Sequence, residues 1–179
     1  VLDTFMKENA GWEGAWQPRH LGRILEIGEA RCQTVEEEGI TGKPLLWNIE
    51  RQRIGRDLEG FIEADTRRRA ELGCRFAAGE HAFGMKPDDK PPVRVTLPDG
   101  SSIAFRGSID RVDRDADGGL AVYDYKSGST FSYKGLERDH LKGGQLLQVP
   151  MYALAALRDF GESAAPVRAS YWFVTRKGE

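Results

Sequence analysis

Two short runs decide the fold of this chain: Gly107-Ser108-Ile109-Asp110-Arg111-Val112-Asp113 and Val122-Tyr123-Asp124-Tyr125-Lys126-Ser127-Gly128. Each run sits in a stretch with strand signals, and Asp115-Ala116-Asp117-Gly118-Gly119 between them has the composition of a turn. The pattern therefore predicts a β-hairpin whose two strands carry acidic residues.

The predicted hairpin brings two carboxylates together. If Arg114 pairs with Leu120 across the turn, antiparallel pairing places Asp110 opposite Asp124. Directly opposed residues share a face with Cβ atoms about 4.5–5.5 Å apart, where like charges are destabilising. A divalent cation between the carboxylates would compensate, and hard oxygen ligands suit Mg²⁺ or Mn²⁺. A β-bulge would shift the register by one residue and weaken this pairing.

Lys126 adds a positive charge to the same predicted face. It lies two residues beyond Asp124, and side chains alternate along a strand with a period of two. Two carboxylates and a lysine suit phosphodiester hydrolysis, in which a metal activates water and the ammonium stabilises developing negative charge. The alternative is a surface hairpin with a solvated ion pair. Arg111 and Asp113 alternate onto the opposite face, where we predict a structural role.

Three motifs in order resemble those of RecB-like nuclease domains in the PD-(D/E)XK superfamily. Gly-x-x-Asp-Arg-hydrophobic-Asp from Gly107 and Asp-x-Lys-Ser-Gly from Asp124 resemble the family's second and third motifs. The family's helical Gln-x-x-x-Tyr signature matches Gln148 to Tyr152. Glu80-His81-Ala82-Phe83-Gly84 looks like the family strand that carries a glutamate before the acidic hairpin. A lone Asp-x-Lys would be a weak signal, whereas three ordered motifs are a strong one.

The resemblance implies a role for each matched residue. It implies metal binding by Asp110, Asp124, Glu80 and the backbone carbonyl of Tyr125, with Asp110, Asp124 and Lys126 as the catalytic residues. Lys126 would act on the attacking water, while Gln148 and Tyr152 would contact the nucleic-acid backbone. For Glu80 the alternative is a strand-end charge in water, and for Tyr152 it is a purely structural position in the core.

The implied activity is that of a magnesium-dependent (or manganese-dependent) deoxyribonuclease, an exonuclease rather than an endonuclease. The implied partners are DNA and a helicase domain or subunit, within a bacterial helicase–nuclease or a recombination exonuclease. One family feature is missing: such nucleases carry a histidine three residues before a leucine on the first helix. If Leu2 is that leucine, the histidine falls two positions before Val1. A non-catalytic DNA-binding or subunit-docking module therefore remains the alternative function.

The order of predicted elements indicates one α/β (α+β) domain over residues 1–179. We expect a helical part over 1–73 and, over 74–179, a restriction-endonuclease-like mixed β-sheet flanked by helices. The predicted helices span 18–38, 44–72 and 148–160, and the predicted strands span 75–83, 93–97, 103–112, 121–126 and 167–174. Pro150 predicts either that the last helix begins near Leu147, with proline in its first turn, or that the helix is kinked there, and we favour the first. Arg67-Arg68-Arg69 points three ways around a helix, so we expect a solvated face.

Composition places the chain among ordinary globular proteins. Of its 179 residues, 40% are hydrophobic and 30% are charged, and the net charge is -2. This charge excludes a broadly basic nucleic-acid-coating protein but permits a local DNA site that uses metal. Two cysteines without metal-ligand spacing favour a reduced, cytoplasmic setting. The helical pattern at Val1 starts without a cap or an initiator methionine, so we expect a piece of a longer protein.

Overall fold

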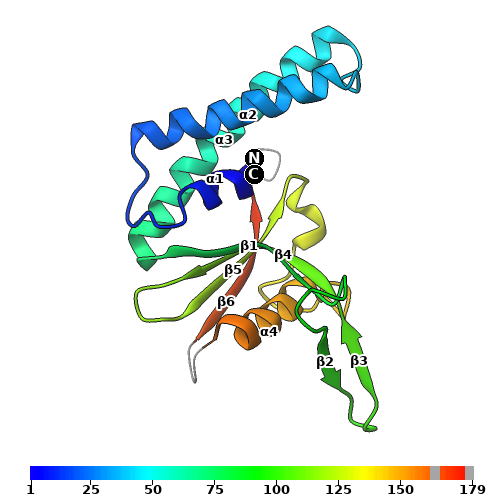
Figure 1. Ribbon diagram of the computed structural model, residues 1–179. Coiled ribbons are helices and arrows are strands. Elements are labelled where there is room, and N and C mark those ends of the chain that lie inside the picture. The colour runs from blue at the N-terminus through cyan, green and yellow to red at the C-terminus, as the bar shows by residue number, and fades with distance from the viewer. Residues whose placement is uncertain (162–165, 176–179) are drawn as a thin grey trace.

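The computed structural model describes residues 1–161 and 166–175 and places helices on both sides of a four-stranded sheet (Figure 1). In chain order the elements are α1 (Leu2–Glu8), α2 (Pro18–Glu37), α3 (Pro44–Leu72), β1 (Arg75–Phe83), β2 (Val93–Thr96), β3 (Ser102–Phe105), β4 (Gly107–Arg114), β5 (Leu120–Lys126), the 3₁₀ helix η1 (Thr130–Tyr133), α4 (Gln148–Phe160) and β6 (Val167–Phe173). The helical N-terminal part and the later sheet are as predicted.

The main sheet is mixed, with strand order β1-β4-β5-β6. Strand β4 is antiparallel to both β1 and β5, whereas β6 is parallel to β5. The hairpin register is the predicted one: Arg114 pairs with Leu120, and the ladder continues to Arg111 opposite Tyr123. In the connecting loop, the Asp115 N–H donates to the Gly119 carbonyl at 2.9 Å. This confirms the mixed α/β architecture and the hairpin.

The prediction of one strand over 103–112 is wrong. The chain leaves its first pairing after Phe105, and β3 pairs with β2 in a separate two-stranded ribbon that projects from the domain (Figure 1). A second strand, β4, begins at Gly107, where an added Cβ would lie only 3.0 Å from the Tyr152 ring. Glycine therefore lets the chain pass close under α4 and enter the main sheet. Alternation of apolar residues continues across the break, so periodicity could not reveal it.

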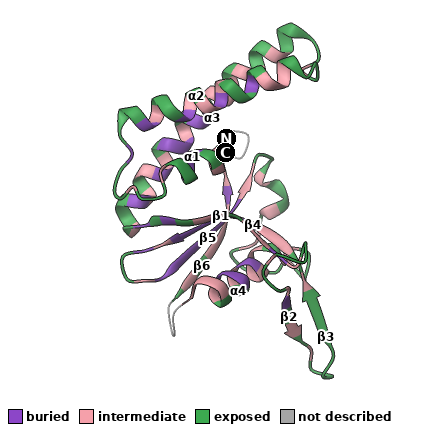
Figure 2. Ribbon diagram, viewed as in Figure 1, coloured by how far each residue is buried: buried purple, intermediate pink, exposed green. Residues whose placement is uncertain are grey.

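Each face of the sheet carries its own core (Figure 2). Toward α1–α3 the cluster includes Phe5, Phe61 and Trp172. Toward α4 a second cluster includes Val122 and Ala155. Alternate residues of β5 therefore enter different cores, which explains why most of this strand is buried.

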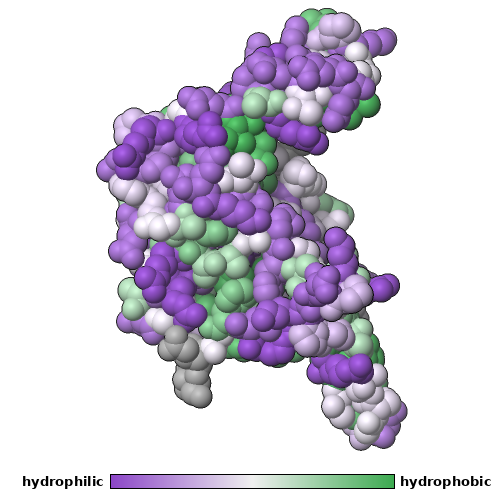
Figure 3. Space-filling view, in the orientation of Figure 1, coloured by the Kyte–Doolittle hydropathy of each residue, from purple (hydrophilic) through white to green (hydrophobic). Residues whose placement is uncertain are grey.

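The α2–α3 pair extends beyond the sheet as a helical hairpin (Figure 1). Each helix begins with proline in its first turn, and α3 ends at Gly73, whose φ of 58° suits a left-handed helix end. Hydrophilic side chains cover much of the hairpin surface in Figure 3. Within the described residues, no helix is both long and apolar enough to cross a membrane.

The prediction of a solvated arginine triplet is wrong for Arg69. This residue is only 1% exposed; its Nε donates to the Gly14 carbonyl at 2.9 Å, and its guanidinium lies over the Trp16 ring. Arg68 lies over the Tyr123 and Trp172 rings, and of the three arginines only Arg67 is exposed. The loop between α1 and α2 supplies the partners of Arg69. The helical pattern of the sequence could not predict a contact with so distant a segment.

Candidate active site

Asp110 and Asp124 lie at the end of the β4–β5 hairpin that is far from its turn. The regular ladder stops at Arg111 and Tyr123, and beyond it the Tyr125 N–H donates to Asp110 Oδ2 at 2.6 Å. The simplest register predicted that the two carboxylates would be partners in a regular ladder. The ladder stops before it reaches them. They are nevertheless close enough for the Asp110 charge to raise the pKa of Asp124.

A chain of contacts joins the two remaining motifs. Lys126 forms an ion pair with Asp124, and its Nζ donates to Gln148 Oε1 at 3.1 Å. The Gln148 amide in turn donates to the Tyr152 hydroxyl at 3.0 Å. Helix α4 begins at Gln148, with Pro150 in its first turn as predicted. The last residues of β5 and the first turns of α4 thus present one continuous polar surface.

Burial acts on both members of the Asp124–Lys126 pair. It raises the pKa of Asp124, which is 2% exposed; the Lys126 contact opposes this rise, but the net shift is upward. Burial alone would lower the pKa of Lys126, yet the hydrogen bond and charge of Asp124 outweigh it and the net pKa is raised. Lys126 is therefore held as an ammonium, while the charge on Asp124 is only partly compensated.

Glu80 lies on the neighbouring strand β1 within electrostatic range of Asp110. Burial raises its pKa, and the charges of Asp110 and Asp3 raise it further, while a Ser108 hydrogen bond opposes the rise. Its φ of 50° is unusual for a non-glycine residue and marks a local distortion of β1 beside the site.

Sequence reasoning missed Asp3, an acidic residue of α1 that lies against this part of the site. Its Oδ2 pairs with Lys7 at 2.9 Å, and its Oδ1 would clash with a Cβ added at Gly79. A glycine at 79 is therefore what lets α1 approach β1 so closely. The only sequence signal for Asp3 was its place near the start of the first helix.

The oxygen ligands at this site suit a hard divalent cation. Within the described residues, no three histidine, cysteine or acidic side chains form a ready-made metal site. Mg²⁺, however, is often held by one or two carboxylates together with water and substrate phosphate. Asp124 Oδ2 is buried and, apart from its ion pair with Lys126, has no hydrogen bond of good geometry. The residues that would hold a metal are Asp110, Asp124 and the Tyr125 carbonyl, with Glu80 beside them.

The opposite face of the same hairpin is a closed network of charges. Arg111 is fully buried and donates to both carboxylate oxygens of Asp113, at 2.7 and 2.6 Å. It also lies 3.0 Å from Asp65 of α3, which accepts a hydrogen bond from the Trp16 indole at 2.7 Å. The predicted structural role of Arg111 and Asp113 is confirmed.

Histidine side chains are directed away from the candidate metal residues. His81 follows Glu80 in the chain, but its Nε2 lies 2.8 Å from Asp159 of α4. His20 is buried beside Trp12 and Trp16, and His140 contacts the Leu136 carbonyl. Each of the three histidines therefore has a partner outside the candidate metal residues. Asp159 and the Phe160 ring partly cover His81.

Known proteins resemble part of this chain. It is 38% identical over 96 residues to a subunit of the ATP-dependent helicase/deoxyribonuclease of Symbiobacterium thermophilum, a match that covers 51% of this chain. It is 36% identical over 91 residues, or 47% of this chain, to the subunit of the same name from Exiguobacterium sibiricum. Each match spans about 8% of the relative's length.

A family model supports the same relationship over a longer span. The model for the PD-(D/E)XK nuclease superfamily matches residues 3–179, nearly the whole chain. The mixed sheet, the acidic hairpin and the motif helix described above all lie inside this match. The chain belongs to the PD-(D/E)XK nuclease superfamily.

Proposed function

We propose that this domain is a metal-dependent deoxyribonuclease whose catalytic residues are Asp110, Asp124 and Lys126. The observation that carries the proposal is the Asp124–Lys126–Gln148 chain of contacts at the end of the hairpin where Asp110 lies. A merely structural ion pair would not require a second, poorly neutralised carboxylate beside it. The superfamily match supports phosphodiester bonds as the target.

In this proposal, Asp110, Asp124 and the Tyr125 carbonyl hold Mg²⁺ or Mn²⁺, with Glu80 as a further carboxylate. The ion, when bound, supplies a polarised phosphoryl oxygen and an acidified water. Lys126 stabilises the negative charge that develops on the reacting phosphate and orients the attacking water. The contacts of Lys126 with Asp124 and Gln148 restrict the position of its ammonium before substrate binds.

Gln148 and Tyr152 would contact the backbone of the nucleic acid. They occupy the first turns of α4, where unpaired backbone N–H groups favour a phosphate. Tyr152 also packs against Phe83 at a ring separation of 6.0 Å, so its ring serves the core while its hydroxyl faces Gln148. The functional and structural roles of Tyr152 are therefore compatible.

The substrate and setting are proposed from the relatives. Both are named helicase/deoxyribonuclease subunits, which supports DNA as substrate and a helicase domain or subunit as partner. We propose cleavage from DNA ends rather than at internal positions. Circular and linear forms of one DNA, compared as substrates, distinguish the two, since an exonuclease requires an end.

The direct test is cleavage of end-labelled linear DNA with Mg²⁺, with Mn²⁺ or with EDTA. We expect cleavage only with metal, and its loss in Asp110→Asn. Asp117→Asn is the matched control, because it removes the same charge from an exposed residue in the turn of the same hairpin. Lys126→Ala should lower turnover and leave calorimetric Mg²⁺ binding intact, since an ammonium cannot ligate a cation. Equal cleavage by Asp110→Asn and Asp117→Asn would refute the assignment.

A non-catalytic DNA-binding domain is the second candidate. It is favoured by the lack, among the residues described, of a three-ligand metal site. DNA binding without cleavage, in a folded protein with Mg²⁺ bound, would support this second function. Cleavage that depends on Asp110 would exclude it.

A further inference from the structure

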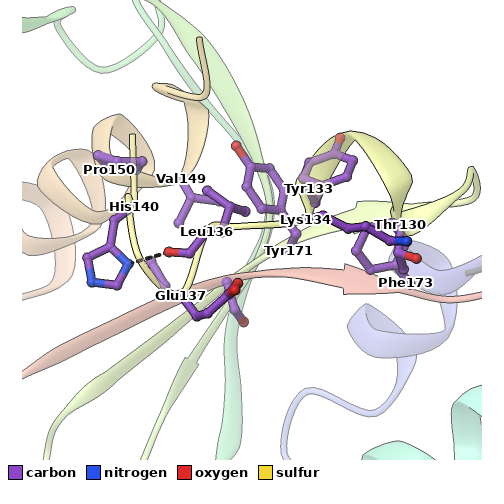
Figure 4. Close-up of a pocket in the computed structure, with 12 residues that line it drawn as sticks. Thr130, Tyr133, Lys134, Leu136, Glu137, His140, Val149, Pro150, Tyr171 and Phe173 are labelled. Atoms are coloured by element: carbon purple, nitrogen blue, oxygen red, sulfur yellow. Dashed lines mark hydrogen bonds between the residues drawn. The ribbon is translucent and has the colours of Figure 1, made fainter. Parts of the chain in front are cut away.

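A cavity of about 650 Å³ opens next to the candidate active site (Figure 4). Strand β6 forms one side with Tyr171 and Phe173, and the segment after β5 forms another with Tyr133. The start of α4 closes it with Val149 and Pro150. Neither the proposed metal site nor the core requires a cavity at this place.

Strand pairing places this cavity beside the proposed catalytic residues. In the parallel β5–β6 ladder, Asp124 pairs with Tyr171 and Lys126 pairs with Phe173. Neighbouring strands lie about 4.8 Å apart and paired residues share a face. The Lys126 ammonium is 5.5 Å from the centre of the Tyr171 ring. A phosphate held at Lys126 would therefore have its own nucleoside within reach of the cavity.

The lining of the cavity suits a flat aromatic ligand with polar edges. Tyr133 lies 4.6 Å from Tyr171 and 5.1 Å from Phe173, measured between ring centres, so three aromatic rings meet there. Lys134, Glu137 and His140 add polar groups around the same cavity. Bases stack on aromatic side chains regardless of sequence, while polar groups contact their edges and the backbone. A purely aliphatic ligand would leave the polar groups unpaired.

We propose that this cavity binds an unpaired base of the nucleotide next to the scissile phosphate. The inference rests on the proposed nuclease function, to which it adds a base-binding site. A base that remains paired and stacked in a duplex cannot present its face to these rings. Tyr133 acts as a substrate-positioning residue, because it touches the base and not the reacting phosphate.

Binding can be measured without cleavage. The probe is a fluorescently labelled oligothymidylate of about 12 nucleotides, titrated with the full chain in EDTA and followed by anisotropy. Tyr133→Ala should weaken binding about 5- to 100-fold, the usual contribution of one stacked base, whereas Tyr133→Phe should restore it. Phe131→Ala is the matched control, since Phe131 belongs to the same 3₁₀ helix but is 73% exposed and lies outside the cavity. The same probe annealed to its complement should bind more weakly to the wild type and should not respond to Tyr133→Ala.

A second measurement changes the DNA probe, so its result on the wild type does not depend on the folding of a variant. One abasic site is moved stepwise through the oligonucleotide, and one position should weaken binding to the wild type while leaving the affinity of Tyr133→Ala unaltered. Equal affinity for all abasic probes, or equal effects of Tyr133→Ala and Phe131→Ala, would overturn the base-binding inference. Metal-dependent cleavage by the wild type, measured in parallel, decides separately whether the nuclease proposal holds.

Discussion

The two faces of the β4–β5 hairpin treat their acidic residues in opposite ways. On the α3 face, Asp113 and Asp65 are matched by the buried cations Arg111 and Arg69. On the α4 face, the ammonium of Lys126 lies near the carboxylates of Asp124 and Asp110, and the charge of Asp110 also raises the pKa of Glu80 on β1. A buried charge without a partner is costly, so an under-neutralised group of carboxylates is expected where an external cation completes it. We expect the closed network to stabilise the domain, and the open one is where we propose that a metal binds.

The largest expected effect comes from breaking the closed network. Arg111→Met should lower the free energy of unfolding by about 3–5 kcal/mol, because it leaves Asp113 and Asp65 buried without their shared cation. Urea denaturation measures the change. Arg138→Met, at a guanidinium whose side chain is 90% exposed, is the control and should change stability by less than about 0.5 kcal/mol. A loss below about 1 kcal/mol in Arg111→Met would mean that this network is not a main source of stability.

A substitution in the open network should have the opposite effects: a large loss of activity and no loss of stability. Asp124→Asn should lower metal-dependent cleavage about 100- to 1,000-fold, an effect typical of losing one main electrostatic contact in a transition state. Its unfolding free energy should stay the same or rise, measured without metal at neutral pH. Burial raises the pKa of Asp124 in the folded state, so folding favours the protonated form and stability falls as pH rises through that pKa. Marked destabilisation of Asp124→Asn would show that both faces are structural.

Cys74 provides a local readout of the closed face. Burial and then the charge of Asp113 raise its pKa to about 11, compared with the 9.0 of an ordinary thiol, so its thiolate at pH 8 is about 100-fold rarer. In a Cys32→Ser background, iodoacetamide should therefore label native protein slowly at pH 8 and faster as the pH approaches 11. Adding Arg111→Met should speed labelling at pH 8 by letting the destabilised buried face open, because loss of this cation by itself would raise the thiol pKa further. Labelling of the native thiol as fast as in urea would contradict this picture of the buried face.

The smallest expected effect is stabilisation by metal. At ten times its dissociation constant, Mg²⁺ should add about 1.4 kcal/mol to the unfolding free energy of the wild type. Asp110→Asn should lose this gain, whereas Asp117→Asn should keep it. Thermal melts at increasing Mg²⁺ give the comparison. An equal gain in unfolding free energy in all three proteins would mean that the metal binds away from the hairpin.

Much of the architecture was predictable because local sequence patterns determine it. Pro18 and Pro44 mark the first turns of two helices, and the acidic turn after Arg114 determines the register of the hairpin. Helix α4 was predicted with both of its ends because Pro150 confines its start. These features depend on residues that are close in sequence, which is where propensity and periodicity are informative.

The unpredicted features all depend on distant partners. Arg69 is buried because loop carbonyls near Trp12 and Gly14 reach it, and the strand break before Gly107 follows from the close passage of α4. In the site, the Asp124, Lys126 and Gln148 positions followed from motif spacing, and the structure brings them into contact; their catalytic roles remain predictions. Asp3 was missed because its approach to Gly79 is purely tertiary.

The Lys126–Gln148 hydrogen bond has a consequence for how such a domain can change over evolution. It joins residues 22 positions apart and closes the base of the segment that carries Tyr133. Closing a loop costs chain entropy that grows only slowly with length, about 0.6 kcal/mol for each doubling. Insertions or deletions between these two anchors are therefore cheap for the fold and leave the sheet untouched. The surface proposed to meet the substrate can be rebuilt in length and composition while the proposed catalytic residues keep their positions.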